Sequence, residues 1–416
     1  MKKQITYMII FLSLSVFSQE QITLEECYQL LNTNFPLAKQ SVLLEKQNAL
    51  DLETIKTGKL PEINFSAQAT YQSDVIEIPI PNAGIEPINN DQYRATVSVS
   101  QLIYGGGIID ATLKAKTTIL KTQQKQVDVN LYQLKKQLNQ LYFSILLTQE
   151  KRGLLIEKEK QLNAKLTEVK SGIKNGVLIP TSDKILQAEL LKVKQQFSEI
   201  NLNTESLINT LSSLIGKEIN TNLSFENPMV STEFNTEIFR PELELFQLKK
   251  QQIETSETII SKENSPKLFG FVNGGYGNPG LNMLDNSFQP FYTVGVKLNW
   301  KVFDWNATKK KRESLSIHKD IIDNEAEIFA LNTNIELAQQ QSEIQKLEGL
   351  ISSDLEIIQL RKEVLKSAES QLKNGVITSS SYITELTNLY EAETMLNTHK
   401  IQILLAKANY NTTKGN

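Results

Sequence analysis

The chain has 416 residues, enough for two or three ordinary domains or for one elongated domain. Its charges nearly cancel, at a formal net charge of −3, so it lacks the basic face that a nucleic-acid-binding protein needs. Cys27 is the one cysteine, which excludes an intramolecular disulfide and a cysteine-based metal site. Composition therefore argues against nucleic-acid partners and against a disulfide-stabilised or cysteine-ligated metal fold.

The first 18 residues differ from all that follow. Lys2 and Lys3 precede an apolar run over residues 5–17, and the small residue Ser18 comes next. This order predicts a secretory signal peptide at 1–18 and a mature chain that starts near Gln19. The run is shorter than the roughly 20 residues that a membrane-spanning helix needs, and no later stretch is apolar enough to form one. Any membrane insertion of the exported chain must then use β-strands.

Alternation of apolar and polar residues appears in four segments. In "INFSAQATY", Ile63, Phe65 and Tyr71 share one face, with Asn64 and Ser66 on the other. The segments at 93–101, 268–276 and 292–303 repeat this pattern and complete two predicted hairpins, at 61–103 and 266–303. Alternating segments of about ten residues with aromatic ends are typical of transmembrane β-strands. A soluble β-sandwich shows similar alternation, so the strands alone leave both possibilities open.

Apolar residues recur at every seventh position after each predicted hairpin. This spacing predicts long helices packed as coiled coils at 107–174 and 305–373. At 1.5 Å per residue, each helix would be about 100 Å long. Thr148 is the one break in the first series, and the apolar positions are Leu113, Leu120, Val127, Leu134, Leu141, Leu155, Leu162 and Val169, then Ile344, Ile351, Ile358, Leu365 and Leu372.

The tetrapeptide "KNGV" ends both long helices, at 174–177 and 373–376. Gly176 and Gly375 can adopt the left-handed conformation that closes a helix. Return helices are predicted at 183–214 and 382–410, so each "KNGV" marks the tip of a helical hairpin.

The same offset of 199 residues relates Tyr104 to Phe303, and an offset of 205 relates Pro61 to Pro266. Because the matched elements keep one order, we infer an internal duplication. The first repeat covers 19–216, the second covers 240–416, and 217–239 connects them. Each repeat reads as helix, β-hairpin, long helix, tip and return helix. The predicted fold class is mainly α with transmembrane β.

No residues form a catalytic or metal-binding pattern. His318 and His399 are far apart, each within a polar helical stretch, and "GGG" at 105–107 lacks the Lys and Ser/Thr of a phosphate-binding loop. We therefore predict a non-enzyme without cofactor or metal.

Four strands cannot close a membrane barrel, so several chains must contribute. The sequence resembles the TolC family of outer-membrane efflux proteins. The resemblance is carried by "TLEECYQLLNTNFPL", by Arg240-Pro241-Glu242-Leu243, by "QLIYGGG" and "KVFDWNATKKKRESL", and by the two "KNGV" tips. It covers the mature chain in order.

The resemblance implies a homotrimer in the outer membrane, with a 12-stranded β-barrel continued by a periplasmic α-helical barrel. As the exit duct of a tripartite efflux system, it would pass small molecules from an inner-membrane transporter and a periplasmic adaptor. The adaptor would dock at the tips, at Gly176, Val177, Leu178, Gly375, Val376 and Ile377. The resemblance also implies a pore constriction just after the tips, at Asp183 and its counterpart Tyr382. Family tunnels are often narrowed there by carboxylates, which Asp183 supplies and Tyr382 does not.

Three alternatives stay open. A type I protein secretion duct shares the fold. A periplasmic coiled-coil scaffold or adaptor would suit the heptads but not the strands, and an exported enzyme would need the catalytic set that is missing. At the tips, Leu178 and Ile377 are either docking residues or residues that pack back on their own helices.

Overall fold

The computed structural model describes residues 21–76, 87–221, 223–234 and 237–415. The predicted signal peptide lies outside these residues. The chain divides into two compact units, one built from residues up to 38, 130–240 and 330 onward, the other from 39–129 and 241–329. No helix within the described residues has the length and hydropathy needed to cross a membrane.

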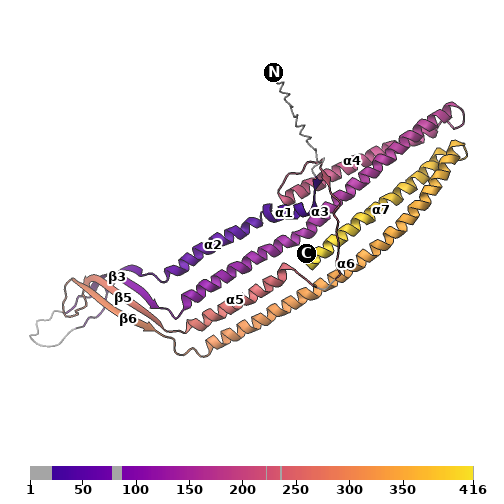
Figure 1. Ribbon diagram of the computed structural model, residues 1–416. Coiled ribbons are helices and arrows are strands. Elements are labelled where there is room, and N and C mark those ends of the chain that lie inside the picture. Colours follow the sequence, from indigo (N-terminus) through magenta and orange to yellow (C-terminus); the bar gives the residue numbers. More distant parts are fainter. Residues whose placement is uncertain (1–20, 77–86, 222, 235–236, 416) are drawn as a thin grey trace, which may run out of the picture. The chain divides into compact units, whose positions relative to one another are not determined.

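The first unit is helical, and its helices run as two antiparallel pairs (Figure 1). One pair joins the end of α3 (Ile108–Lys174) to α4 (Ser182–Ile215), and the other joins the end of α6 (Ala307–Lys373) to α7 (Ser379–Lys414). The short helix α1 (Leu24–Asn34) begins at Thr23, whose side chain accepts a hydrogen bond from the Glu26 amide at 3.1 Å. Two short parallel strands, β1 (Gln21–Ile22) and β4 (Ser224–Phe225), complete the unit.

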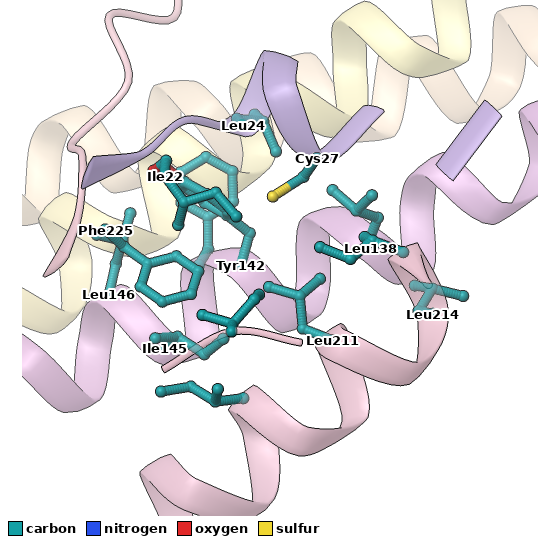
Figure 2. Close-up of a cluster of buried hydrophobic side chains, with 14 of the residues drawn as sticks. Ile22, Leu24, Cys27, Leu138, Tyr142, Ile145, Leu146, Leu211, Leu214 and Phe225 are labelled. Carbon is teal, nitrogen blue, oxygen red and sulfur yellow. The ribbon is translucent and has the colours of Figure 1, made fainter. Parts of the chain in front are cut away.

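One core of this unit lies where α1, α3, α4 and the two short strands meet (Figure 2). Tyr142 and Phe225 pack edge to face with ring centroids 5.3 Å apart, and the Tyr142 hydroxyl donates to the Glu226 carbonyl at 2.7 Å. Cys27 is fully buried there, and burial raises the pKa of its thiol to about 12. Cys27 is therefore a neutral packing residue.

A second core follows the paired helices toward their tips. It contains the predicted seventh positions Leu155, Leu162 and Val169 of α3 together with Ile358, Leu365 and Leu372 of α6. The predicted coiled-coil helices are thus confirmed. The break in the pattern, Thr148, is also buried, and its hydroxyl donates to the Ile145 carbonyl at 2.7 Å. A polar residue is tolerated there because its own helix satisfies it.

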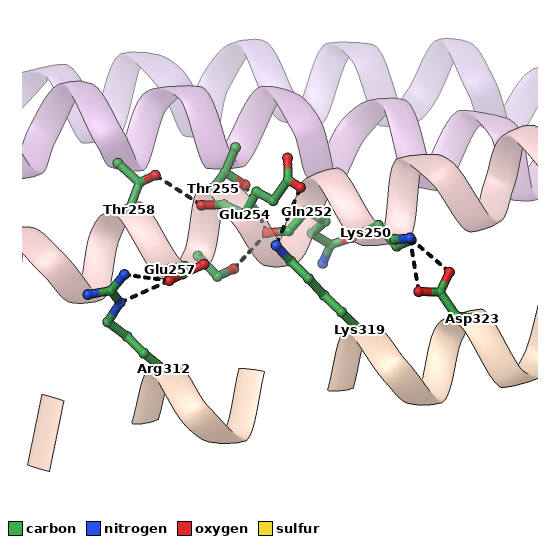
Figure 3. Close-up of polar contacts among 10 residues, drawn as sticks. Lys250, Gln252, Glu254, Thr255, Glu257, Thr258, Arg312, Lys319 and Asp323 are labelled. Atoms are coloured by element: carbon green, nitrogen blue, oxygen red, sulfur yellow. Dashed lines mark hydrogen bonds and ion pairs between the residues drawn. The ribbon is translucent and has the colours of Figure 1, made fainter. Parts of the chain in front are cut away.

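The second unit contains an antiparallel sheet of order β2-β3-β5-β6 among the described strands. The strands are β2 (Glu62–Tyr71), β3 (Asp91–Tyr104), β5 (Lys267–Asn278) and β6 (Gln289–Asn299). Helices α2 (Ala38–Thr57) and α5 (Pro241–Glu263) belong to this unit, with the first turns of α3 and α6. Ion pairs join α5 to α6, including Glu257 with Arg312 at 2.8 Å and Lys250 with Asp323 at 2.8 Å (Figure 3).

The internal duplication is visible in the backbone where strand becomes helix. Gly106 and Gly107 have φ of 65° and 81°, and Trp305 and Asn306, each 199 residues later, have φ of 55° and 61°. Both repeats therefore enter the long helix through two successive left-handed residues. In the second repeat β6 ends at Asn299, before the end of the alternating segment at Phe303.

Candidate functional site: a two-faced sheet and two helical tips

The sheet has one apolar and one polar face, because its register aligns residues of one kind across all four strands. Ile63 pairs with Val99, Val99 with Val272, and Val272 with Val294. One position along, on the opposite face, Asn64 pairs with Ser98, Ser98 with Asn273, and Asn273 with Thr293. Such alternation across the whole sheet separates an apolar environment from an aqueous one.

The apolar face is exposed in the single chain. Its large side chains include Phe65, Tyr292, Val294 and Val296, and each is among the exposed hydrophobic residues. Strands β2 and β6 also stand at the edges of the described sheet, where their outer backbone groups have no ladder partner. An exposed apolar face with two open edges requires an apolar surrounding and further strands.

Aromatic side chains gather where β2, β3, β5 and β6 reach the loop-bearing edge of the sheet. Phe288 stacks between Tyr93 and Tyr276, with ring centroids 6.3 and 5.7 Å apart. Tyr71 and Tyr292 are exposed on the same apolar face. Tyrosines at the end of an apolar strand face are typical of a membrane–water interface, where ring and hydroxyl meet different solvents.

Phe271 and Phe291 lie on the polar face, and each covers a glycine on the neighbouring strand. A β-carbon on Gly275 would lie 2.4 Å from the Phe291 ring, and one on Gly295 would lie 2.8 Å from the Phe271 ring. The Arg94 guanidinium lies 5.4 Å from the centre of the Phe291 ring. These rings shield glycine-rich strand backbone, so their place on the polar face has a packing reason.

Each "KNGV" closes its helix by the same backbone hydrogen bonds. In the first tip the amides of Gly176 and Val177 donate to the carbonyls of Ile173 and Gly172, at 3.0 and 2.9 Å. The second tip repeats this with Gly375 and Val376, and the two glycines have φ of 73° and 72°. This is the Schellman arrangement, which needs a residue free to adopt the left-handed conformation.

The side chains that follow the two glycines divide into packed and exposed residues. Leu178 and Ile377 are half-buried against the second core, while Val177 and Val376 are 53% and 71% exposed. The two tips also touch, since a β-carbon on Gly375 would lie 3.2 Å from the Val177 carbonyl oxygen. Of the two interpretations left open for Leu178 and Ile377, the packing one matches these positions.

Asp183 and Tyr382 occupy different surroundings. The Asp183 carboxylate accepts from Gln187 at 3.1 Å and lies 3.6 Å from the Lys184 ammonium. Tyr382 is only 1% exposed, and the Lys165 ammonium lies 5.1 Å from its ring centre. Burial raises the pKa of its hydroxyl. In this conformation Tyr382 is a core residue, because its ring contributes to the apolar packing of the hairpins.

A buried ion pair near the tips has no signal in the sequence. Lys158 of α3 and Glu189 of α4 lie 2.9 Å apart with side chains 5% and 11% exposed, and the Lys158 ammonium is 4.6 Å from the Tyr390 ring centre. In the sequence both residues look like ordinary charged positions on helical surfaces. No group of three or more acidic, histidine or cysteine residues is arranged to hold a metal ion in the described part of the chain.

Comparison with solved structures defines the fold class. No family model matches the chain, and no curated protein matches it in sequence. The CmeC outer membrane channel of Campylobacter jejuni is 16% identical with a TM-score of 0.66, over 94% of this chain and 85% of that one. The outer membrane protein VceC of Vibrio cholerae is 14% identical with a TM-score of 0.66, over 94% of this chain and 96% of that one. CusC is 11% identical with a TM-score of 0.70, over 94% of this chain and 92% of that one.

The chain therefore has the fold that these outer membrane channels share. At the level of fold this confirms the resemblance to the TolC family, which the sequence carries in its repeated junctions and tips.

Proposed function

We propose that this protein is an outer-membrane channel that serves as the exit duct of a tripartite efflux system. The observation that carries the proposal is the exposed apolar face of the sheet, opposite a polar face, in a chain with the fold of outer membrane channels. The polar face would line an aqueous passage for small molecules. No catalytic step is part of this function.

The dimensions of the apolar face suit a bilayer. Ile63 and Tyr71 lie eight residues apart in β2, which is about 27 Å along a strand at ~3.4 Å per residue. With the usual tilt of about 40°, this gives a band about 21 Å tall, close to the ~25 Å apolar band of outer-membrane barrels.

The open edges support assembly as a homotrimer, since three copies of a four-stranded sheet make a barrel of twelve strands without free edges. Native mass measurement of the full chain in detergent is expected to give three chains. A folded monomer that inserts into vesicles by itself would overturn the shared barrel, because its edges would then face lipid.

The periplasmic partners we propose are an adaptor that docks at the tips and an inner-membrane transporter that supplies cargo. Val177 and Val376 suit docking, because they are apolar, exposed and held by closed helix ends. Gly176 and Gly375 allow these helix ends to close, while Leu178 and Ile377 pack against the second core beside them. Of the two positions after the tips, Asp183 is the one that we propose for a constriction.

The double variant Val177→Asp/Val376→Asp tests docking in cells. We expect normal trimer and outer-membrane levels but loss of dye export, since charge at the tips opposes burial against an adaptor. The matched control is Val177→Thr/Val376→Thr, which keeps shape without charge and should retain most export. Normal export by the aspartate variant would overturn docking at these residues. Adjacent genes for a proton-driven exporter would favour efflux over protein secretion.

A further inference from the structure

We propose that the connection between β6 and α6 binds anionic phospholipid headgroups at the membrane surface on the helical side of the barrel. This surface, the β6–α6 junction, consists of Lys301, Phe303, Trp305, Lys309 and Lys310. The inference rests on the proposed function, since the sheet must lie in a membrane for the junction to reach its surface.

The backbone of the junction holds a large side chain in an unfavourable conformation. Trp305 has φ of 55°, and the residue at the same place in the first repeat is Gly106, with φ of 65°. Glycine adopts this left-handed conformation freely, whereas a bulky residue with positive φ is an outlier. The second repeat therefore places tryptophan where the turn itself favours glycine, which indicates that the ring serves a function beyond the turn.

A set of hydrogen bonds keeps this turn in place. The Asp304 carboxylate accepts from the Thr308 amide at 2.9 Å and from the Asn264 side chain at 2.8 Å, and it also bonds the Thr308 hydroxyl. The bonds from Thr308, then from Asn264, hold the pKa of Asp304 well below its usual range, so the carboxylate stays ionised and accepting. The first repeat has Gly105 at this position and no such cap.

The aromatic rings at the junction project into solvent in the single chain. Trp305 is 82% exposed, and Phe303 packs against it edge to face with centroids 4.8 Å apart. The chain contains two tryptophans, and the other, Trp300, is also exposed and follows β6 by one residue. Both tryptophans therefore lie between the end of β6 and the start of α6. Tryptophan is enriched at membrane–water interfaces, where its amphipathic ring sits at the level of the headgroups.

Lysines flank these rings in the sequence, and two of them occupy a place that is unfavourable for the helix. Lys309 and Lys310 lie in the first turn of α6, which has no acidic residue, although the helix dipole disfavours positive charge there. Two following cations are used internally, since Lys311 bonds Glu263 and Arg312 bonds Glu257, each at 2.8 Å.

Three lysines of the junction remain directed to the outside. Lys301 and Lys310 are exposed and form no ion pair among the described residues, and Lys309 has only Glu313 at 3.9 Å. Lysines beside an interfacial aromatic cluster attract anionic lipid headgroups. The combination fits the phosphate of an anionic phospholipid at this edge of the sheet.

A second copy of the chain is the other surface that could cover the junction, because β6 is an edge strand. The edge that a second copy would offer is β2, which follows the exposed Lys56 and also Lys59, whose charge is paired with Asp110 at 2.8 Å. Lys56 therefore brings positive charge toward a positive junction, and the Lys59–Asp110 pair offers no free acidic group. The acidic residue at that edge, Glu62, lies on the polar face of the sheet. Charge complementarity therefore favours lipid.

Tryptophan quenching by brominated lipids tests the inference. The full chain carrying Trp300→Phe, in which Trp305 is the one tryptophan, is reconstituted in phosphatidylcholine vesicles with equal fractions of brominated phosphatidylglycerol or brominated phosphatidylcholine. Each engaged lysine is expected to favour the anionic lipid about fivefold, so brominated phosphatidylglycerol should quench Trp305 more strongly. The triple variant Lys301→Gln/Lys309→Gln/Lys310→Gln should be quenched equally by both lipids.

A matched variant, Lys160→Gln/Lys184→Gln/Lys192→Gln, removes three lysines that are as exposed but lie on α3 and α4. It should keep the anionic preference. Resistance of the vesicle-bound protein to alkaline extraction measures insertion separately, and a chain that fails to insert would overturn the proposed function itself. Equal quenching of inserted protein by both lipids would overturn the anionic preference. Absence of quenching by either would show that another chain covers Trp305, which also overturns the inference.

Discussion

Leu178 lies against Gly172 of its own helix, so closely that a β-carbon on the glycine would come within 2.8 Å of the leucine Cδ1. The leucine folds back over the helix end that Gly176 closes. Leu178→Ala should therefore loosen the tip by about 1–3 kcal/mol, at the lower end of the range for leucine truncation because the side chain is only half-buried.

Hydrogen exchange of the backbone between residues 165 and 190 measures this loosening. Val177→Ala is the control, since Val177 is exposed and its truncation should change stability by no more than about 0.5 kcal/mol. Equal effects of the two substitutions would contradict the division into packed and exposed residues.

The ion pair between Lys158 and Glu189 should show strong coupling. Lys158→Met leaves the buried carboxylate with only the exposed Lys192, 3.5 Å away, and should cost about 3 kcal/mol of unfolding free energy. The double variant Lys158→Met/Glu189→Leu should recover most of this loss, because neither charge remains buried. Denaturation in detergent provides the values. For comparison, Lys160→Met breaks the exposed pair with Glu157 and should change stability by under about 1 kcal/mol.

The same pair predicts a pH dependence. Burial raises the pKa of Glu189, but the hydrogen bonds and charges of Lys158 and then Lys192 together lower it by more, so its pKa in the folded protein lies below the ordinary value. The stabilisation is then present above the unfolded pKa of about 4.3 and is lost as pH falls through the lower folded pKa. Wild type should lose more unfolding free energy than Lys158→Met/Glu189→Leu between pH 7 and pH 3. Parallel pH curves for the two proteins would refute this.

The loops at the tyrosine-bearing edge of the sheet should face the outside of the cell. They are 72–90, of which 77–86 lie outside the described residues, and 279–288. Asn286 donates a side-chain hydrogen bond of 2.9 Å to Asn89 between the two loops. A protease site inserted after the exposed Met283 should be cut on intact cells. The same site inserted after Val177 should be cut only once the outer membrane is opened. The reverse result would invert the orientation.

The local periodicities of the sequence were sufficient to predict the four strands of the sheet and the long helices. Alternation in "INFSAQATY" predicts a strand with two unlike faces, and apolar residues at every seventh position predict the long helices, because each pattern depends on backbone geometry within one segment. The glycines of the two tips were also predictable, since the left-handed conformation that ends a helix favours glycine in any context.

Tertiary structure decided what depends on contacts between distant segments. Tyr382, predicted at a constriction, is buried because it belongs to a core built from residues of α3, α4, α6 and α7. Leu178 is covered while Val177 is exposed because the tip turns back on its helix. The pairing of Lys158 with Glu189 likewise needs two helices in one register. At the β6–α6 junction, the sequence "FDWNAT" shows nothing unusual. Only the folded backbone shows that Trp305 adopts the left-handed conformation that favours glycine, and that the Asp304 carboxylate accepts a hydrogen bond from the Thr308 amide. These features depend on packing and long-range hydrogen bonds, which the periodicity of a single segment does not encode.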